Sequence, residues 1–244
     1  MSHIVPAIPG TPIHIRPAAE LAERVVLPGD PQRALAIAQA HLESPRMFNT
    51  RRGLWGYTGQ TASGLAVTVQ ATGMGGPSAA IVVEELVDLG ARVVVRAGTC
   101  GAIDARLALG ELLAASGALA ADGASRALGA GERVDADAAL TAALVDSGGG
   151  SAVTVASTDL FYDPRPDAEP RWRDGGAVAV EMEAAAVLQV AAHRGVRAGC
   201  VLLVTDIITA EGRERLDDDE LERRALDLGG VALHALETDA SEGR

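Results

Sequence analysis

The 244-residue chain contains no lysine, only six aromatic residues and only two cysteines. Without lysine, any phosphate that side chains bind must be held by arginine guanidinium groups, together with backbone amides. Cys100 and Cys200 have neither the spacing of a metal site nor that of a disulfide framework. We therefore expect no metal, and a reducing, cytoplasmic compartment.

Long apolar runs are also absent. None reaches the roughly 18 residues that a membrane span requires. Residues 1–6 lack the charged region and apolar stretch of a signal peptide. The formal net charge of −12 disfavours a nucleic-acid surface. We expect neither a membrane nor a nucleic acid among the partners.

What is present is a core-forming sequence, since 48% of the residues are apolar. Short apolar runs alternate with helical stretches, which predicts an α/β fold with a central mixed, twisted β-sheet flanked by helices. We predict a single domain over residues 12–237, an N-terminal arm at 1–11 and a C-terminal tail at 238–244. Strands are predicted at 25–27, 52–57, 65–70 (with a turn at Gly59), 92–97, 111–116, 152–156, 177–180 and 198–204, and helices at 34–41, 78–89, 184–193 and 219–236.

Anion-binding features follow two of the predicted strands. Gly29 lets backbone amides approach an anion, and Arg33 lies in the first turn of the next helix, whose N-terminus favours negative charge. In the second segment, Arg96 precedes a glycine loop that carries the hydroxyl of Thr99. A guanidinium, loop amides and a hydroxyl together suit a phosphate. Each segment by itself is also compatible with an ordinary turn.

Carboxylates mark two further strand ends. Glu181 and Glu183 lie where a buried strand gives way to a helix, which is costly for charge unless it is paired. They suit either sugar hydroxyls or the cap of the helix. Asp206 follows an apolar strand and is a helix cap or a proton donor. The adjacent Phe161 and Tyr162 suit the core or a flat pocket for a base.

The glycine loop at residues 73–78 does not complete the GxGxxG pattern, and no GxxxxGK[ST] motif is present. A dinucleotide site is therefore disfavoured.

Taken in order, six segments resemble the purine nucleoside phosphorylase and uridine phosphorylase family, in particular its hexameric bacterial type. The resemblance covers about residues 11–236. The segments are Leu-Pro-Gly-Asp-Pro-Gln-Arg at 27–33, Arg-Gly-Leu-Trp-Gly-Tyr-Thr-Gly at 52–59, Gly-Met-Gly-Gly-Pro-Ser at 73–78, Arg-Ala-Gly-Thr-Cys-Gly-Ala at 96–102, Asp-Leu-Phe-Tyr at 159–162 and Val-Glu-Met-Glu-Ala at 180–184.

The resemblance implies phosphorolytic cleavage of purine ribonucleosides and 2′-deoxyribonucleosides, which gives a free base and (deoxy)ribose 1-phosphate in nucleoside salvage. Inorganic phosphate would be a substrate, and no cofactor is implied. A homo-oligomer with shared sites is implied, a hexamer built as a trimer of dimers. The implied phosphate ligands are Gly29, Arg33, Arg96, Ala97, Gly98 and Thr99, with Arg52 from a neighbouring subunit.

The implied nucleoside ligands lie in four parts of the chain. Asp206 would protonate purine N7, and Glu183 would accept hydrogen bonds from the ribose hydroxyls. An arginine of the late helix would assist Asp206; among Arg213, Arg215, Arg223 and Arg224 we select Arg223. The full implied nucleoside set is His14 from a neighbouring subunit, Phe161, Val180, Glu181, Met182, Glu183, Thr205 and Asp206.

Four alternatives stay open. A uridine phosphorylase usually carries a glutamine after the Phe-Tyr pair, and residues 163–167 contain none. A related nucleosidase uses water and would not need Arg33, Arg52 and Arg96. A methylthioadenosine phosphorylase differs in its 5′ pocket, where His14 favours a hydroxyl. A silent nucleoside- or phosphate-binding protein would not need Asp206. The family often has serine where Thr99 stands, and the change keeps the hydroxyl.

Overall fold

The computed structural model describes residues 12–209 and 212–242, so the predicted arm at residues 1–11 lies outside the described residues. The strands are β1 (Arg24–Leu27), β2 (Glu43–Asn49), β3 (Gly56–Gln60), β4 (Ala66–Gln70), β5 (Val93–Ala102), β6 (Leu112–Ala120), β7 (Arg133–Asp135), β8 (Ser151–Ser157), β9 (Ala177–Glu181), β10 (Arg197–Thr209) and β11 (Gly212–Arg215). The helices are α1 (Pro31–His41), α2 (Gly76–Asp88), α3 (Gly123–Ala127), α4 (Ala138–Asp146), α5 (Ala168–Asp174), α6 (Ala184–Arg194), α7 (Asp218–Glu242) and the 3-10 turn η1 (Arg51–Gly53).

The described strands form one mixed sheet that partly closes on itself. β5 pairs with β10, and the series β10, β6, β8, β9 and β5 completes a ring of five strands. β1, β4, β3 and β2 extend the sheet from β5 as an open wing. The sheet contains both parallel and antiparallel pairs, and the predicted mixed α/β sheet is confirmed.

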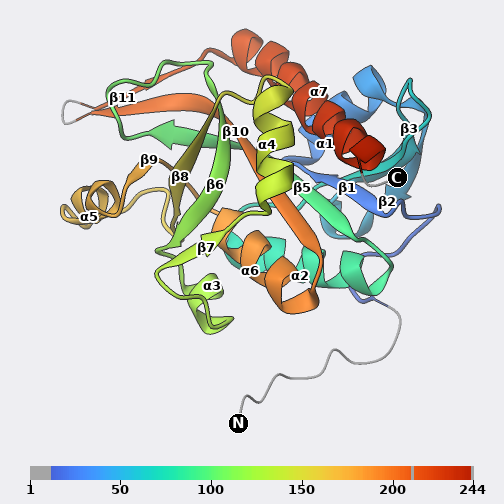
Figure 1. Cartoon of the computed structure of the whole chain (residues 1–244), viewed down its shortest axis with the longest axis horizontal. Helices are drawn as coiled ribbons and strands as arrows, with labels where there is room; N and C mark the ends of the chain where they lie inside the picture. Colours follow the sequence, from blue (N-terminus) through green and yellow to red (C-terminus); the bar gives the residue numbers. More distant parts are fainter. Residues whose placement is uncertain (1–11, 210–211, 243–244) are drawn as a thin grey trace.

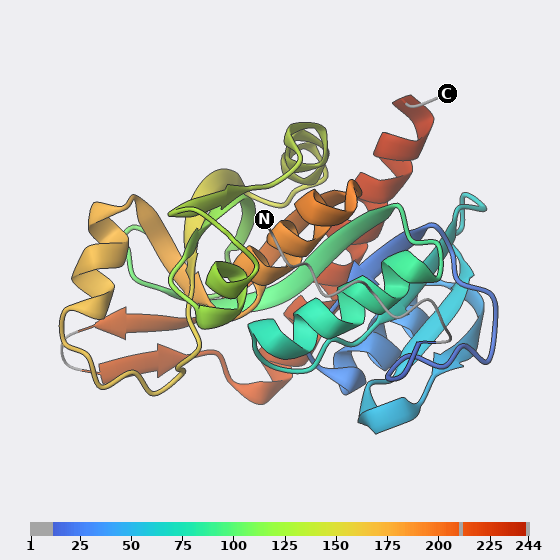
Figure 2. The ribbon, with the colours of Figure 1, turned by 90° about the horizontal axis from the view of Figure 1, so that it is seen from below.

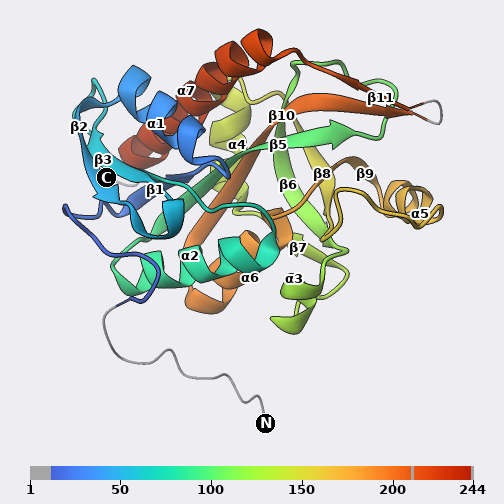
Figure 3. The same cartoon turned by 180° about the vertical axis from the view of Figure 1, so that it is seen from behind.

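Helices cover both faces of the sheet (Figure 1). On one face α1, α4 and α7 pack together over a core that includes Ile37, Leu144 and Leu228. On the other face α2 and α6 lie side by side (Figure 2), and Val82 and Leu188 belong to a second core. The α5 helix and the β10–β11 hairpin lie at the same end of the molecule (Figure 3). Among the described helices, none is both long and apolar enough to cross a membrane.

Two sequence predictions about local structure were wrong. Residues 52–57 are not one strand, because Arg52 has a left-handed backbone (φ 58°) inside η1 and the strand begins only at Gly56. Gly59 lies within β3 and not in a turn. The chain reverses instead at residues 61–65, where the amide of Thr61 donates to the carbonyl of Leu65. Strand β2, which precedes this turn, is rich in polar residues and was not predicted.

The C-terminal helix is longer than the sequence pattern predicts. Its predicted end at residue 236 and the domain limit at 237 both fall inside α7, which continues to Glu242. Asp239 explains the extension, because it is buried and pairs with Arg197 at 2.7 Å and with Arg24 at 3.6 Å. Residues 243–244 of the predicted tail lie outside the described residues.

Two consecutive glycines lie in the interior of α7, where glycine costs about 1 kcal/mol relative to alanine. At Gly229 the cost has a packing reason. A Cβ there would lie 2.6 Å from Cγ1 of Ile37, which is fully buried in α1. The glycine therefore allows α1 and α7 to approach each other closely.

We predict that Gly229→Val lowers the free energy of unfolding by about 1–3 kcal/mol, the usual cost of overpacking a core. Ile37→Ala removes the atoms that clash, so the same substitution should cost less in that background. Urea unfolding of the four proteins in this cycle measures both effects. Strictly additive losses would contradict the proposed contact.

Candidate active site

A cavity of about 710 Å³ opens where several strands end, and most of the residues singled out from the sequence line it. Those that line it are Gly29, Arg33, Arg96, Gly98, Thr99, Phe161, Val180, Glu181, Met182, Glu183, Thr205 and Asp206. Residues that sequence reasoning did not single out complete the lining, among them Gly73, Met74, Gly101, Asp163, Arg165, Trp172, Ile208 and Arg213.

Arg96 is the central cation of the cavity. It projects from β5, its side chain is only 3% exposed, and Nε donates to Glu181 at 2.9 Å while Nη2 pairs with Glu183. Burial alone would lower the pKa of this guanidinium, but Glu183 and Glu181 together raise it above its ordinary value. Among the described residues, no group accepts a hydrogen bond from Nη1.

Gly98 gives this arginine its conformation. The Arg96 side chain folds back over the strand, so that a Cβ at residue 98 would lie 2.5 Å from Nη2. Any other residue would displace the guanidinium. The glycine is therefore needed for the position of the charge, in addition to any amide contact with a ligand.

Glu181 uses its whole acceptor capacity within the protein. Its carboxylate accepts hydrogen bonds from Arg96, from the hydroxyl of Ser157, and from the backbone amides of Glu183 and Ala184. The Ser157 hydroxyl accepts from the amide of Ala185, so its proton is free to point at Glu181. Four donors match the roughly four lone-pair sites of a carboxylate.

Burial raises the pKa of the Glu181 carboxyl, and Glu183 acts in the same direction while Arg96 and Ser157 oppose it. The four donors nevertheless require an ionised acceptor. Glu181 therefore orients Arg96 and the start of α6, although the sequence resemblance placed it among the nucleoside ligands.

Glu183 has a different environment. One carboxylate oxygen accepts from the amide of Gly75 and the other pairs with Arg96, but its side chain keeps 8% exposure toward the cavity. The glycine loop at residues 73–78, which does not match a dinucleotide-binding motif, thus holds the Glu183 carboxylate in place. Gly75 has φ 90°, a conformation that favours glycine. Glu183 retains acceptor sites that can face a ligand.

Arg33 lies beside this cluster, in the first turn of α1. The helix begins after Asp30, whose side chain accepts from the amide of Gln32 at 2.8 Å. Burial lowers the pKa of Arg33, and the positive charge of Arg96 adds to the effect. Two neighbouring guanidinium groups form a natural site for an anion.

A slot for a flat ligand lies across three neighbouring strands. Strand register places Asp206 on β10 opposite Gly101 on β5, and Gly101 opposite Val180 on β9. Gly101 leaves the middle of this row without a side chain. A Cβ at residue 101 would lie 2.8 Å from Ile208 Cδ1, so the Ile208 side chain lies close to the backbone of Gly101 at the base of the slot. Phe161, on the loop after β8, also lines the cavity.

Asp206 is buried at a β-bulge of β10, three residues before the last residue of that strand. Thr205 donates to its Oδ2 at 2.7 Å. The other oxygen lies 3.2 Å from Arg215 Nε and 3.8 Å from Arg213 Nη1, and it accepts no hydrogen bond from the described residues. The predicted strand end at residue 204 was wrong, because β10 continues to Thr209 and pairs with β11.

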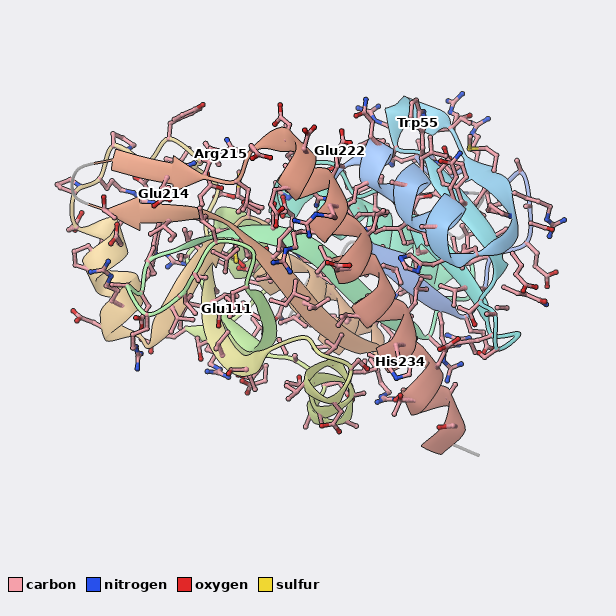
Figure 4. The ribbon with its side chains drawn as sticks, turned by 90° about the horizontal axis from the view of Figure 1, so that it is seen from above. Trp55, Glu111, Glu214, Arg215, Glu222 and His234 are labelled. Atoms are coloured by element: carbon pink, nitrogen blue, oxygen red, sulfur yellow. The ribbon has the colours of Figure 1, made fainter. Side chains whose placement is uncertain are left out.

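The structure does not place Arg223 with Asp206. Arg223 lies on α7, is 60% exposed and pairs with Glu220 of the same helix. The arginines near the carboxylate instead come from β11, which carries Arg215 (Figure 4). Strand register places Arg215 directly opposite Asp206. Arg213 lines the cavity, and its guanidinium carbon lies 4.2 Å from the centre of the Phe161 ring. The short strand β11 carries no strong sequence signal, so this pairing was not predicted.

Besides Arg223, three predicted site residues do not line the cavity of their own chain. The Ala97 side chain lies in the core. Arg52 is exposed on η1. His14 lies on a segment held by Glu85, which accepts from the amides of Ile13, His14 and Ile15 and from the His14 ring at 2.7 Å. Burial would raise the pKa of Glu85, but these hydrogen bonds bring it below its usual value.

Within the described part of the chain, no three His, Cys, Asp or Glu side chains gather in a way that would hold a metal ion. The ionisable groups of the cavity are instead arranged as cations and carboxylates that face one another. Such a site can bind an anion beside a polar, uncharged ligand.

Comparison with known proteins matches this arrangement. The sequence model of the phosphorylase superfamily covers residues 23–237. A purine nucleoside phosphorylase DeoD-type of Clostridium perfringens (strain SM101 / Type A) is 38% identical over 205 residues, 79% of this chain and 85% of that protein. Proteins of the same name from Jannaschia sp. (strain CCS1) and Geobacillus kaustophilus (strain HTA426) are 37% and 38% identical; the matches cover 91% and 83% of this chain, and 98% and 91% of those proteins. The chain belongs to the phosphorylase superfamily.

Proposed function

We propose that this protein is a purine nucleoside phosphorylase, which transfers the pentosyl group of a purine nucleoside to inorganic phosphate. The observation that carries the proposal is the buried Arg96, whose Nη1 has no acceptor among the residues that the structure describes. It lies beside Arg33 in a cavity that also contains Asp206. The relatives that share most of the chain bear the same activity in their names.

The reaction breaks the bond between C1′ and N9 and forms a bond between C1′ and a phosphate oxygen. The bonding electrons leave with the base, and positive charge develops on the sugar. Orthophosphate held by Arg33 and Arg96 supplies both the nucleophile and a stabilising negative charge. Fixing the anion and the sugar together supplies much of the rate enhancement.

The sugar would lie over Glu183, between the anion site and the base slot. The free acceptor sites of Glu183 suit the 2′- and 3′-hydroxyls. Because Arg96 contacts the same carboxylate, a single ion pair would position both the nucleophile and the sugar. Met182 also lines this part of the cavity.

The base would occupy the slot over Gly101, between Val180 and Asp206, with Phe161 at its edge. Asp206 would donate a proton to N7 of the leaving purine, a contribution of about 10²–10⁴-fold in general acid catalysis. A pyrimidine has no N7, so this carboxyl favours purines over uridine. Arg213 takes the assisting role that we first gave to Arg223.

His14 and Arg52 would take part in the proposed site only in an oligomer. Neither lines the cavity of its own chain. The segment that carries His14 is held by Glu85 of α2 and by Asn49 of β2, and this segment and both elements carry exposed apolar residues. Ile13 is 62% exposed, Met47 39% and Ile81 42%. We propose that a second copy covers this surface and contributes His14 and Arg52 to the neighbouring cavity. Further copies would build a hexamer as a trimer of dimers.

The direct test is base release from inosine, adenosine, uridine and methylthioadenosine, with and without inorganic phosphate. We expect both inosine and adenosine to be cleaved, only with phosphate, and uridine to be cleaved poorly. Cleavage without phosphate would indicate a nucleosidase. A protein that binds these nucleosides and cleaves none of them would contradict an enzymatic function.

The role of Arg213 is tested against Arg223. We predict that Arg213→Ala lowers kcat/KM for inosine by roughly 10–100-fold, the equivalent of losing one charge-assisted hydrogen bond. Arg223→Ala is the matched control on α7 and should change kcat/KM less than about twofold, since its partner is a surface glutamate. The reverse order would restore the assignment of Arg223.

The role of Glu181 is tested by Glu181→Gln, which keeps the shape but places an amide where a carboxylate accepts four hydrogen bonds. We predict that KM for phosphate rises by roughly tenfold or more, because Arg96 loses its orienting partner. KM for inosine should change much less. A selective rise in the KM for inosine would instead make Glu181 a sugar ligand. Circular dichroism of the variant checks that it folds.

A further inference from the structure

The cavity continues beyond the slot proposed for the base. This extension, which we call the distal lobe, has no role in holding the phosphate or the sugar in the proposed function. Its lining is formed by residues of α5, of the segment before it and of β10, namely Asp163, Arg165, Pro166, Ala168, Glu169, Trp172 and Ile208.

Strand geometry connects the distal lobe to Asp206. Side chains two residues apart on a strand point to the same face, so Ile208 follows Asp206 along the wall of the cavity. Ile208, Trp172 and Val180, which bounds the base slot, all pack against one small core of Ile103, Ala156 and Ala177. A group that extends from the base past Asp206 therefore meets Ile208 and then the indole ring of Trp172.

The distal lobe combines apolar side chains with charged side chains that neutralise one another. Ala168 and Trp172 are four residues apart on α5 and so share one face of the helix. The charged residues around them are already paired. Arg165 contacts Asp163 at 2.5–2.8 Å, and Glu169 contacts Arg173 at 2.6 Å. Such a surface suits an aromatic or branched apolar group and offers little to a charged one.

We propose that the distal lobe binds an apolar substituent on the 6-position of the purine, so that the substrates of this enzyme include N6-aryl and N6-alkyl adenosines. The inference rests on the proposed function, in which Asp206 faces N7. The 6-substituent lies next to N7 on the same edge of the purine, so it points along β10 toward Ile208. The bond that breaks is still C1′–N9, and the substituent leaves with the base.

The test compares N6-benzyladenosine with adenosine, both with inorganic phosphate. We expect the protein to cleave N6-benzyladenosine with a kcat/KM within about tenfold of that for adenosine. Trp172→Ala should lower kcat/KM for N6-benzyladenosine by roughly tenfold, about the worth of one aromatic contact. The same variant should lower kcat/KM for adenosine much less, because the proposal places Trp172 beyond the unsubstituted base.

Two further variants separate the lobe from general effects on folding. Ala168→Leu partly fills the lobe and should also lower kcat/KM for N6-benzyladenosine selectively. Trp55→Ala alters the other tryptophan of the chain, which lies far from α5 (Figure 4), and should not change the ratio of the two substrates.

The remaining outcomes of these experiments distinguish failure of the inference from failure of the proposed function. If adenosine is cleaved while N6-benzyladenosine is neither cleaved nor inhibitory, the lobe is not a binding site, and the proposed function still stands. Equal losses for both substrates in Trp172→Ala would also overturn the inference. If adenosine is not cleaved, the proposed function fails. Calorimetric titration with N6-benzyladenosine then tests the lobe alone, and weaker binding than that of adenosine would refute it.

Discussion

The ion pairs between Arg96 and the two glutamates of the β9–α6 junction organise the candidate site. A guanidinium that is 3% exposed is stable only where its charge is compensated, and Glu181 and Glu183 provide that compensation from one short segment. The two carboxylates differ in what remains available. Glu181 is saturated by donors of the protein, whereas Glu183 and Arg96 each keep groups that a ligand can use.

The fold brings these groups together through strand register. β5 carries Arg96 and Gly101, and it pairs with β1, β10 and β9. The ends of those neighbours carry Gly29, Asp206 and Val180. One strand therefore connects the anion site to the base slot, and its two glycines at 98 and 101 leave room for the guanidinium and for the slot. The pairing of these strands with β5 fixes the relative positions of the residues that they carry.

Much of this arrangement follows from local sequence, and the rest depends on distant pairing. Gly29 and Glu183 each follow an apolar run, so their place at strand ends was predictable from hydrophobic periodicity. Arg96 was predicted just before the end of a strand at residue 97, whereas it lies inside β5, which continues to Ala102. Burial decides which of the two neighbouring glutamates keeps acceptor sites for a ligand, and hydrophobic periodicity does not reveal this burial. Arg213 and Arg215 reach Asp206 only because β11 folds back on β10. Trp172 joins the cavity through the packing of a seven-residue helix, which has too few turns to show a pattern.

The central claim is that Arg96 and Arg33 capture orthophosphate beneath a nucleoside. A crystal structure of the protein soaked in inorganic phosphate tests it most directly. The account predicts one phosphate within hydrogen-bond distance of Arg96 Nη1 and of Arg33, with Glu181 still bound to Arg96 Nε. A phosphate bound elsewhere, or a cavity in which the two guanidinium groups share no anion, would contradict the account.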